Sequence, residues 1–435
     1  LAAPMILQNL ITSTLAMADT FMVGMLGEAP MAGVTLANIP IFVVQLFFFG
    51  VQSGSTVLIS QYWGKGDREA INRVIGVALW AVNLVSVAFA LVLLLFPVPF
   101  LGLFGNEPEV VALAAEYGRL IGLSYVFNGM TLVYLAAWRS MERPRLGMYI
   151  LAASMGINTF LNWVLIFGKL GAPALGVTGA ALATLLARVV EFILMALSVY
   201  ASHEHPLAGK PKELFSFDRE MLRRVLKTSF PVIISEGGWS IGNSVYYIAY
   251  GMLGASSLAV IQVASTINDL FQIFFFGIGN ASAVMIGNEL GRRNREKAQG
   301  YAGVFLKMTF VVSVIVAIGL YCSEGLVVGF YDFDQATNHL LTGTLTVYAI
   351  YMLPKMFTYV LFCGILRSGG DTRFCMMLDL VGVWVIGVPL AFIGVLVLHQ
   401  SLPVVAAMVF FEDWIRLVFA LLRVKSGKWA HVLID

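Results

Sequence analysis

Long apolar runs dominate this chain of 435 residues. They come as segments of about 20 or more residues, the length that an α-helix needs to cross a hydrocarbon layer about 30 Å thick, whereas strands of a membrane barrel alternate over about 10 residues. Charged residues make up only 12% of the chain, against roughly 25% in soluble domains. The sequence therefore predicts an all-α integral membrane protein.

Twelve transmembrane spans are predicted from these runs. They lie near residues 1–26, 31–62, 72–104, 110–138, 146–168, 175–202, 221–252, 256–288, 299–322, 340–366, 374–398 and 402–424. Most of the 27 Lys and Arg residues lie in the breaks after the even-numbered spans and in the C-terminal tail. Because cytoplasmic loops are enriched in Lys and Arg, we expect both termini to be cytoplasmic. Since the sequence begins at Leu1, inside an apolar run and without Met, we also expect an N-terminal segment to precede it.

The sequence also contains an internal repeat. The stretch LISQYWGKGDREA at 58–70 has a near copy, MIGNELGRRNREK, at 285–297. A shift of 227 or 228 positions aligns Pro4 with Pro231, Ser55 with Ser282, Gly64 with Gly291, Arg68 with Arg295, Arg139 with Arg367, and Arg188 with Arg416. The repeat predicts two pseudo-symmetric six-helix bundles of the same orientation, with a central cleft between them. We assign residues 1–202 to an N-lobe, 203–220 to a cytoplasmic linker and 221–435 to a C-lobe.

The repeated polar stretch is interpreted as a basic cytoplasmic turn, and a hinge between moving helices is the alternative. GKGDRE lacks the earlier glycine and the Lys-Ser/Thr pair of a phosphate-binding loop. The sequence also has no HExxH, no CxxC pair and no nucleophile elbow. We therefore predict neither an enzyme nor a cofactor, and the net charge of +2 gives no reason to expect a nucleic-acid partner.

Ionisable residues inside the first six spans are few, and in a membrane such residues mark pathways or coupling sites. Asp19 lies in LAMADTFMVG of span 1, with apolar residues on both sides and no basic neighbour close in sequence. The alternative is a carboxylate at the external membrane surface. Asn158 and Asn162 of span 5 are four residues apart, so both carboxamides can point at one spot. Such a pair can equally hold two helices together.

The second half carries a larger set of ionisable residues. Glu236 follows Pro231 by five residues, so it lies near any helix break, whose free carbonyls could help bind a cation. Asp269 and Asp379 also lie inside spans, and Lys355 is predicted to be the only basic residue deep enough to pair with them. These residues could form a proton relay or a neutralised structural network.

Two further features of the sequence concern structure and ligand. Glu412, Asp413 and Arg416 lie within one turn of span 12 and are predicted to satisfy one another in a structural role. The chain has 31 Phe and 19 Met. A minority of them lining the cleft, with Lys355 and Asp379, would suit flat, cationic, amphipathic ligands.

Several motifs together carry a family resemblance that covers the whole chain. They are Pro4 with MADTFMVG, the pair QYWGKGDRE and GNELGRRNRE, the pair WRSMERPR and LRSGGDTR, GVTGAALAT, and RVKSGKW. The chain resembles the multidrug and toxic compound extrusion (MATE) transporters of the bacterial type. The resemblance implies two six-helix bundles around a cleft, a bacterial plasma membrane and a working monomer.

The resemblance also implies roles for particular residues. Asp19 corresponds to the N-lobe carboxylate that binds the coupling proton or sodium ion, and Pro4 to the proline at which span 1 bends. Asn158 matches the family's Asn-x-x-x-Asp pair, but Asn162 stands where Asp is usual, which weakens a sodium site at Asp19, Asn158 and Asn162. Thr184, with Thr178 as the second choice, would complete this site.

In the C-lobe, Glu236 aligns with the family's span 7 acid, and Asp269 lies near the start of span 8. The span 10 aspartate of one branch is replaced around Lys355 and Met356. Together with Asn162, this replacement favours proton over sodium coupling.

The sequence therefore predicts a secondary antiporter that exports amphipathic, often cationic organic compounds in exchange for H⁺ or Na⁺ by alternating access. A flippase or exporter of lipid-linked or other dedicated metabolites with the same fold is the first alternative. A major-facilitator-type carrier and a channel or receptor are the others.

Overall fold

The protein is described by a computed structural model that covers residues 2–105, 107–201, 205–210, 213–214, 219–331 and 333–434, without the side chains of residues 2–4, 15 and 16. The first helices are α1 (Ala2–Gly24), α2 (Glu28–Lys65), α3 (Arg68–Leu95), α4 (Pro97–Leu101), α5 (Pro108–Ser140), α6 (Pro144–Phe167) and α7 (Gly176–Tyr200). The later ones are α9 (Arg219–Gly251), α10 (Ala255–Gly291), α11 (Arg295–Phe330), α12 (Gln335–Tyr359), η1 (Val360–Leu366), α13 (Thr372–Leu380), η2 (Val381–Gly387), α14 (Val388–Phe392), η3 (Ile393–Val397) and α15 (Leu402–Lys425).

The chain divides into two compact units, Ala3–Ile233 and Ile234–Asp435, and the division falls inside α9. The division comes two residues after Pro231, which lies buried within that helix. The lobe boundaries expected from the sequence, 1–202 and 221–435, stay a prediction. Residues 203–204, 211–212 and 215–218 of the expected linker, and residue 202 before it, lie outside the described residues.

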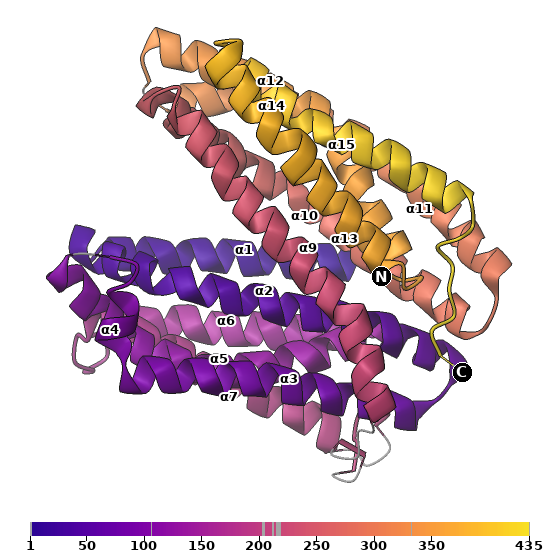
Figure 1. Cartoon of the computed structure of the whole chain (residues 1–435). Helices are drawn as coiled ribbons and strands as arrows, with labels where there is room; N and C mark the ends of the chain where they lie inside the picture. The colour runs from indigo at the N-terminus through magenta and orange to yellow at the C-terminus, as the bar shows by residue number, and fades with distance from the viewer. Residues whose placement is uncertain are drawn as a thin grey trace. The chain divides into compact units, whose positions relative to one another are not determined.

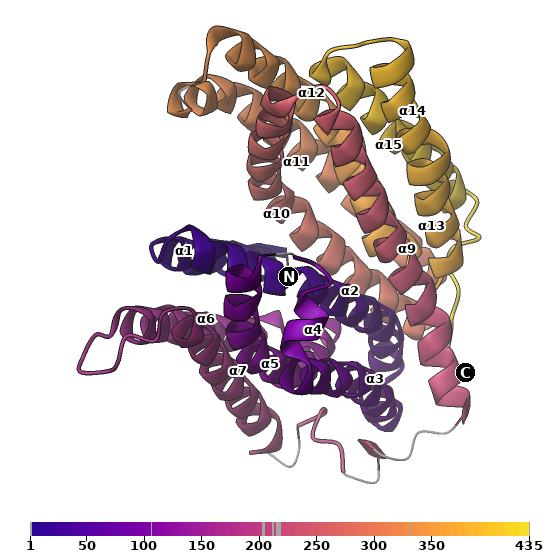
Figure 2. The ribbon, with the colours of Figure 1, turned by 60° about the vertical axis from the view of Figure 1, so that its left-hand side comes forward.

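In the first unit α5 is the central helix. It packs against α2, α3 and α7, and α6 packs on the outer side against α7 (Figure 2). Small residues on α5 let its neighbours approach: a Cβ at Gly122 would lie 3.3 Å from the Cβ of Leu93 on α3. Close approach of this kind is how helices associate in lipid, where burial of apolar surface gives little driving force.

In the second unit the helix formed by α12 and η1 takes the corresponding central place. α12 packs against α10, α11 and α15, and η1 continues along α10 (Figure 1). η1, η2 and η3 are π-helical, with the wider i→i+5 turn. The predicted six-helix repeat is therefore present in the packing of each unit.

The repeat extends to backbone conformation at the turn between α2 and α3 and the turn between α10 and α11. Gly66 and Arg293, 227 positions apart, both adopt a left-handed conformation, with φ of 82° and 62°. The next N–H in each turn donates back to the helix: Asp67 to the Tyr62 carbonyl at 3.0 Å, and Asn294 to the Glu289 carbonyl at 2.9 Å. The sequence repeat thus encodes one helix-turn-helix geometry used twice.

Among the described residues, nine helices are long and apolar enough to cross a membrane. α12 with η1 counts as one of them, and α13 through η3 as another. α1, α9 and α15 complete the twelve predicted helices. α15 falls short of the apolar criterion because Glu412, Asp413 and Arg416 lie in its middle. The all-α prediction with twelve membrane helices in two pseudo-symmetric units is confirmed.

Candidate functional site

Asp19, Asn158, Asn162 and Thr184 come together in the first unit, from α1, α6 and α7. The Asn162 Nδ2 donates a hydrogen bond to Asp19 Oδ1. One turn earlier on α6, the Asn158 Nδ2 donates to the Thr184 hydroxyl at 3.3 Å. The i, i+4 spacing of the two asparagines therefore places one carboxamide against α1 and the other against α7. We call these four residues the Asp19 cluster.

The Asp19 cluster is rich in oxygen atoms. The Asn162 side chain is fully buried, and its Oδ1 has no hydrogen-bond partner in the structure. A buried acceptor without a partner costs free energy unless a proton donor, a water or a cation reaches it. Carboxylate, amide and hydroxyl oxygens are also ligands that hard cations prefer. The cluster thus fits either a proton on Asp19 or a small cation between Asp19 and Asn162.

The positively charged residue nearest to the Asp19 cluster along α7 pairs with another carboxylate. Arg188, one turn after Thr184 on α7, pairs with Glu191 at 2.7 Å. Glu191 is fully buried and also accepts a hydrogen bond from Ser154 at 2.9 Å. Within the described part of the chain, no Lys or Arg lies within 4.0 Å of the Asp19 carboxylate. Thr178, the second choice for the hydroxyl, instead donates to Glu116 at 3.3 Å.

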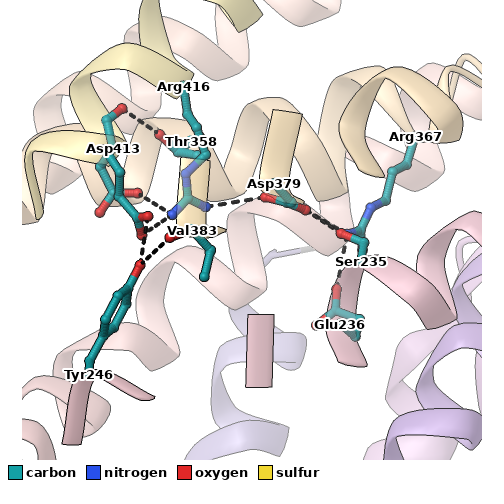
Figure 3. A network of polar contacts seen from close by, with 10 residues as sticks. Ser235, Glu236, Tyr246, Thr358, Arg367, Asp379, Val383, Asp413 and Arg416 are labelled. Carbon is teal, nitrogen blue, oxygen red and sulfur yellow. Dashed lines mark hydrogen bonds and ion pairs between the residues drawn. The ribbon is translucent and has the colours of Figure 1, made fainter. Parts of the chain in front are cut away.

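A second group of charged residues lies inside the second unit (Figure 3). Glu236 on α9 pairs with Arg367, at the end of η1, at 2.9 Å. Arg367 also lies 3.8 Å from the Asp379 carboxylate on α13, which accepts a hydrogen bond from Ser235. The structure therefore links Glu236 and Asp379, two members of the set predicted from the sequence, through one shared guanidinium.

The group continues from Asp379 to α15 through Arg416. Arg416 Nη1 lies 3.2 Å from Asp379, and Nη2 pairs with Glu412 and lies 3.6 Å from Asp413. The Tyr246 hydroxyl on α9 donates to Glu412 at 2.8 Å. We call the connected set of Ser235, Glu236, Tyr246, Arg367, Asp379, Glu412, Asp413 and Arg416 the C-unit network.

The π-helical segment η2 makes room for the C-unit network. A Cβ at Gly382 would lie 2.8 Å from Arg416 Nε, and one at Gly387 would lie 2.5 Å from Glu412 Oε2. Both distances are too short for a real side chain, so a larger residue at either glycine would displace the guanidinium or the carboxylate. π-helical turns of this kind often occur at functional sites.

The prediction that Lys355 is the only basic residue deep in the second half is wrong. Arg367, expected in a basic loop, is only 3% exposed, and Arg416 is buried beside it. Lys355 instead lies over the Tyr348 and Phe410 rings, 5.7 and 5.4 Å from their centroids. The wider turn of η1 ends at Arg367 and carries its side chain inward, which a span count could not show.

Asp269 and the two prolines lie outside both clusters. Asp269 is exposed on α10 and accepts a hydrogen bond from Gln272 at 3.3 Å. Pro231 removes one N–H from the interior of α9, so the Lys227 carbonyl loses its helical partner. Pro4 lies in the first turn of α1, and its side chain is outside the described ones. A bend of span 1 at Pro4 therefore stays a prediction.

Sequence reasoning did not assign Ser235, Tyr246 or Arg367 to a site. A signal for Tyr246 was present, because a shift of 227 positions aligns it with Asp19. Arg367 had been aligned with Arg139, which is half-buried in the first unit. The repeat located both positions, although Tyr246 aligns with an acid and Arg367 aligns with an arginine that is only half-buried.

Two helical units, each crossed by membrane-length helices and each holding buried ionisable groups, define a multi-pass membrane protein of the transporter class. The MatE family model matches residues 4–164 and 231–393. The chain therefore belongs to the MatE family, and the resemblance found in the sequence is confirmed.

Relatives and solved structures cover nearly the whole chain. It is 28% identical over 425 residues to "Probable multidrug resistance protein NorM" of Bradyrhizobium diazoefficiens, covering 95% of this chain and 88% of the relative. The protein of the same name from Thermotoga maritima is 27% identical, over 99% of this chain and 92% of the relative. A Vibrio cholerae MATE transporter, VcmN, has the same fold, with a TM-score of 0.89, 18% identity, and coverage of 99% of this chain and 96% of that one.

Proposed function

We propose that this protein exports amphipathic, often cationic organic compounds from a bacterial cytoplasm in exchange for H⁺ or Na⁺. Relatives that carry the name of a multidrug resistance protein support this proposal. In it the chain works as a monomer in the plasma membrane, with both termini in the cytoplasm and the two lobes, 1–202 and 221–435, exchanging access by rocking about the linker at 203–220.

The Asp19 cluster carries the proposal. A carboxylate inside a membrane lobe is costly when charged, and no Lys or Arg lies within 4.0 Å of Asp19 in the described residues, so an ion from solution has to neutralise it. An ion that binds Asp19 better in one access state than in the other shifts the equilibrium between those states. Loss of the ion on the opposite side resets the carboxylate, so one exchangeable ion can drive a cycle.

Proton coupling is favoured over sodium coupling. With Asn162 in place of a second acid, a cation at the Asp19 cluster would meet one negative charge. A proton needs only one carboxylate, and protonated Asp19 could still bond to the Asn162 carboxamide, whose oxygen has no other partner. Glu236, bound to Arg367, is the second candidate for coupling.

Transport in liposomes tests the proposal. Purified protein would be reconstituted with a fluorescent organic cation, and a proton gradient and a sodium gradient would be imposed separately on wild type, D19N, E236Q and E116Q. E116Q is the matched control, because Glu116 is an exposed acid on α5 of the same unit. We expect transport driven by the proton gradient, at least about tenfold lower in D19N and unchanged in E116Q.

Other outcomes would change the assignment. Sodium-driven transport lost in D19N would keep the site and change the ion. Unchanged transport in both D19N and E236Q would rule out both carboxylates as coupling groups. If neither gradient drives transport, the antiport proposal itself fails.

A dedicated exporter or flippase of anionic, lipid-linked compounds is the second candidate, and Lys355 favours it. The Lys355 amine lies over two aromatic rings, and no carboxylate within 4.0 Å pairs with it in the described part of the second unit. An anionic head group is the natural partner for such an amine. Loss of transport of an anionic lipid in K355M, with transport of the organic cation unchanged, would support this candidate.

A further inference from the structure

The internal repeat relates the Asp19 cluster to one end of the C-unit network. A shift of 227 positions aligns Asp19 on α1 with Tyr246 on α9, and a shift of 228 aligns Thr184 on α7 with Glu412 on α15. The first unit thus has a carboxyl group on its first helix and a hydroxyl group on its last. In the second unit the hydroxyl group is on the first helix and the carboxyl group is on the last.

The contacts at the two places correspond as well. In the first unit the acid of α1 accepts a hydrogen bond from α6, and the hydroxyl of α7 accepts one from the same helix. In the second unit the Tyr246 hydroxyl donates directly to Glu412 at 2.8 Å and lies 3.4 Å from the carbonyl of Val383, in η2. Each unit therefore holds a carboxyl group where its first, fifth and sixth spans meet, hydrogen-bonded to a polar side chain of a neighbouring helix.

The C-unit network contains more acids than bases. Among the described ion pairs, Glu236, Asp379, Glu412 and Asp413 share the guanidinium groups of Arg367 and Arg416 alone. Glu412 and Asp413 are 4% and 7% exposed. Buried charges without full compensation are strongly destabilising, so a network with surplus carboxylates gains from taking up a proton.

Charged and polar groups on α15, α9, α13 and α12 affect how readily Glu412 binds a proton. Arg416 and Asp413 lie on α15 itself, Tyr246 faces Glu412 from α9, and Asp379 reaches it from α13 through Arg416. Lys355 on α12 adds positive charge to this unit, but no ion pair within 4.0 Å joins it to Glu412 in the described contacts. Lys355 therefore reduces the surplus of negative charge without pairing with Glu412.

Tyr246 gives Glu412 a hydrogen bond in either protonation state. When Glu412 is charged, the tyrosine O–H donates to Oε2, as in this structure. When Glu412 carries a proton, its own O–H can donate to the tyrosine oxygen while the tyrosine O–H turns to the Val383 carbonyl. Among the described contacts, neither Asp413 nor Asp379 bonds to a hydroxyl group that also reaches a backbone carbonyl. The exchange gives both hydroxyl donors a partner in each state, so neither state strands the Tyr246 or the Glu412 hydroxyl.

We propose that Glu412 is a proton-binding site of the second unit, the pseudo-symmetric counterpart of Asp19, with Tyr246 as its positioning residue. The proposal rests on the proposed function in one respect, namely that the proton at Glu412 exchanges during transport. When Glu412 is protonated its side chain is uncharged, and of the acids around Arg416 only Asp379 and Asp413 then pair with it as charged groups.

Proton uptake by the purified, full-length protein tests the site without any assumption about substrate. Proton uptake per protein molecule on acidification would be measured for wild type, E412Q, D413N and Y246F, together with the infrared band of a protonated carboxyl group. D413N is the matched control, because Asp413 is the next residue and also contacts Arg416. We expect uptake to fall by about one proton per molecule in E412Q, with loss of part of the carboxyl band, and no such fall in D413N.

Y246F keeps the proposal testable if E412Q does not fold. Without the tyrosine O–H the charged form of Glu412 loses a donor, so the midpoint of proton uptake should move to higher pH by about one unit. The site is overturned if E412Q takes up as many protons as wild type and keeps the whole carboxyl band. If E412Q cannot be prepared, an unchanged midpoint of proton uptake in Y246F overturns it. An equal loss in D413N would also overturn it, by assigning the proton to the network as a whole.

Proton-driven transport in the same variants separates this site from the proposed function. If a proton gradient drives wild-type transport and E412Q lowers the rate several-fold while E116Q, which lies outside the network, does not, Glu412 takes part in the cycle. If the gradient drives no transport in wild type but E412Q still takes up about one proton fewer than wild type, the antiport proposal fails and the proton site stands.

Discussion

Asp67 and Asn294, 227 positions apart, cap their helices in the same way. The Asp67 side chain accepts a hydrogen bond from the Ala70 N–H at 3.0 Å, and the Asn294 side chain accepts one from the Lys297 N–H at 3.2 Å. Each satisfies an N–H that the first turn of its helix, α3 or α11, leaves without a partner. The repeated polar stretch therefore has a structural reason for its residue types.

Removal of either cap should weaken the fold by a similar amount. We expect D67A and N294A each to lower the free energy of unfolding by about 1 kcal/mol, and the double variant to show the sum, because the caps lie in separate units. Thermal unfolding in detergent would measure this. S401A is the control, since Ser401 precedes α15 without a side-chain capping bond. A loss in S401A as large as in D67A would contradict the assignment.

Replacement of Arg416 should be far more damaging. R416M leaves Asp379, Glu412 and Asp413 buried without their shared guanidinium, which we expect to cost about 3–5 kcal/mol. Adding E412Q to R416M should recover part of that loss, because one of the stranded charges is removed. Chemical unfolding of the single and double variants would give the coupling energy between Arg416 and Glu412.

The control for Arg416 lies two turns further along α15. Arg423 pairs with Asp371 at 2.6 Å, and its side chain is 28% exposed. We expect R423M to cost at most about 1 kcal/mol. Equal losses in R416M and R423M would mean that the C-unit network contributes no more than one partly exposed ion pair.

A second carboxylate in the Asp19 cluster should create a sodium preference. In N162D the donor to Asp19 is replaced by a like charge, so a cation is needed between the two groups. We expect Na⁺ to bind N162D about tenfold more tightly than wild type, seen as a rise in Tm with sodium chloride but not with choline chloride at equal ionic strength. No sodium effect in N162D would argue against a cation-sized space beside Asp19.

His205 should make the fold sensitive to mild acid. The ring packs edge-on against Trp138, with centroids 6.4 Å apart, and its Nδ1 accepts the Leu207 N–H at 3.2 Å. Burial and, second, the positive charge of Arg143 lower the pKa of His205. Protonation is thus harder in the folded than in the unfolded chain, so stability is present above the unfolded value of about 6.5 and is lost as pH falls through it.

The measurement is Tm against pH for wild type, H205Q and H339Q. We expect Tm of wild type and of H339Q, at an exposed histidine, to fall between about pH 7.5 and 5.5, and the fall to be smaller in H205Q. The same slope in all three proteins would place the acid sensitivity elsewhere.

Sequence reasoning predicted the helices and the repeat well, because both depend on local patterns. Apolar runs define the spans, and spacing alone placed Asn158 and Asn162 on one face of α6. The C-unit network was predicted only in fragments, because its links to α9 join residues more than 100 positions apart, as Arg367 and Glu236 are. The π-helical turns that carry Arg367 inward have no signal in a hydropathy pattern.

The left-handed turns of the repeat have a practical consequence for protein engineering. Gly66 of the first half corresponds to Arg293 of the second, whereas Gly370 of the second half corresponds to Glu142 of the first, and all four residues have φ between 61° and 82°. A left-handed conformation costs a residue with a side chain roughly 1–2 kcal/mol that glycine avoids. Each half thus already contains a residue that suits the corresponding left-handed turn of the other, and on this ground we expect R293G and E142G to stabilise the fold.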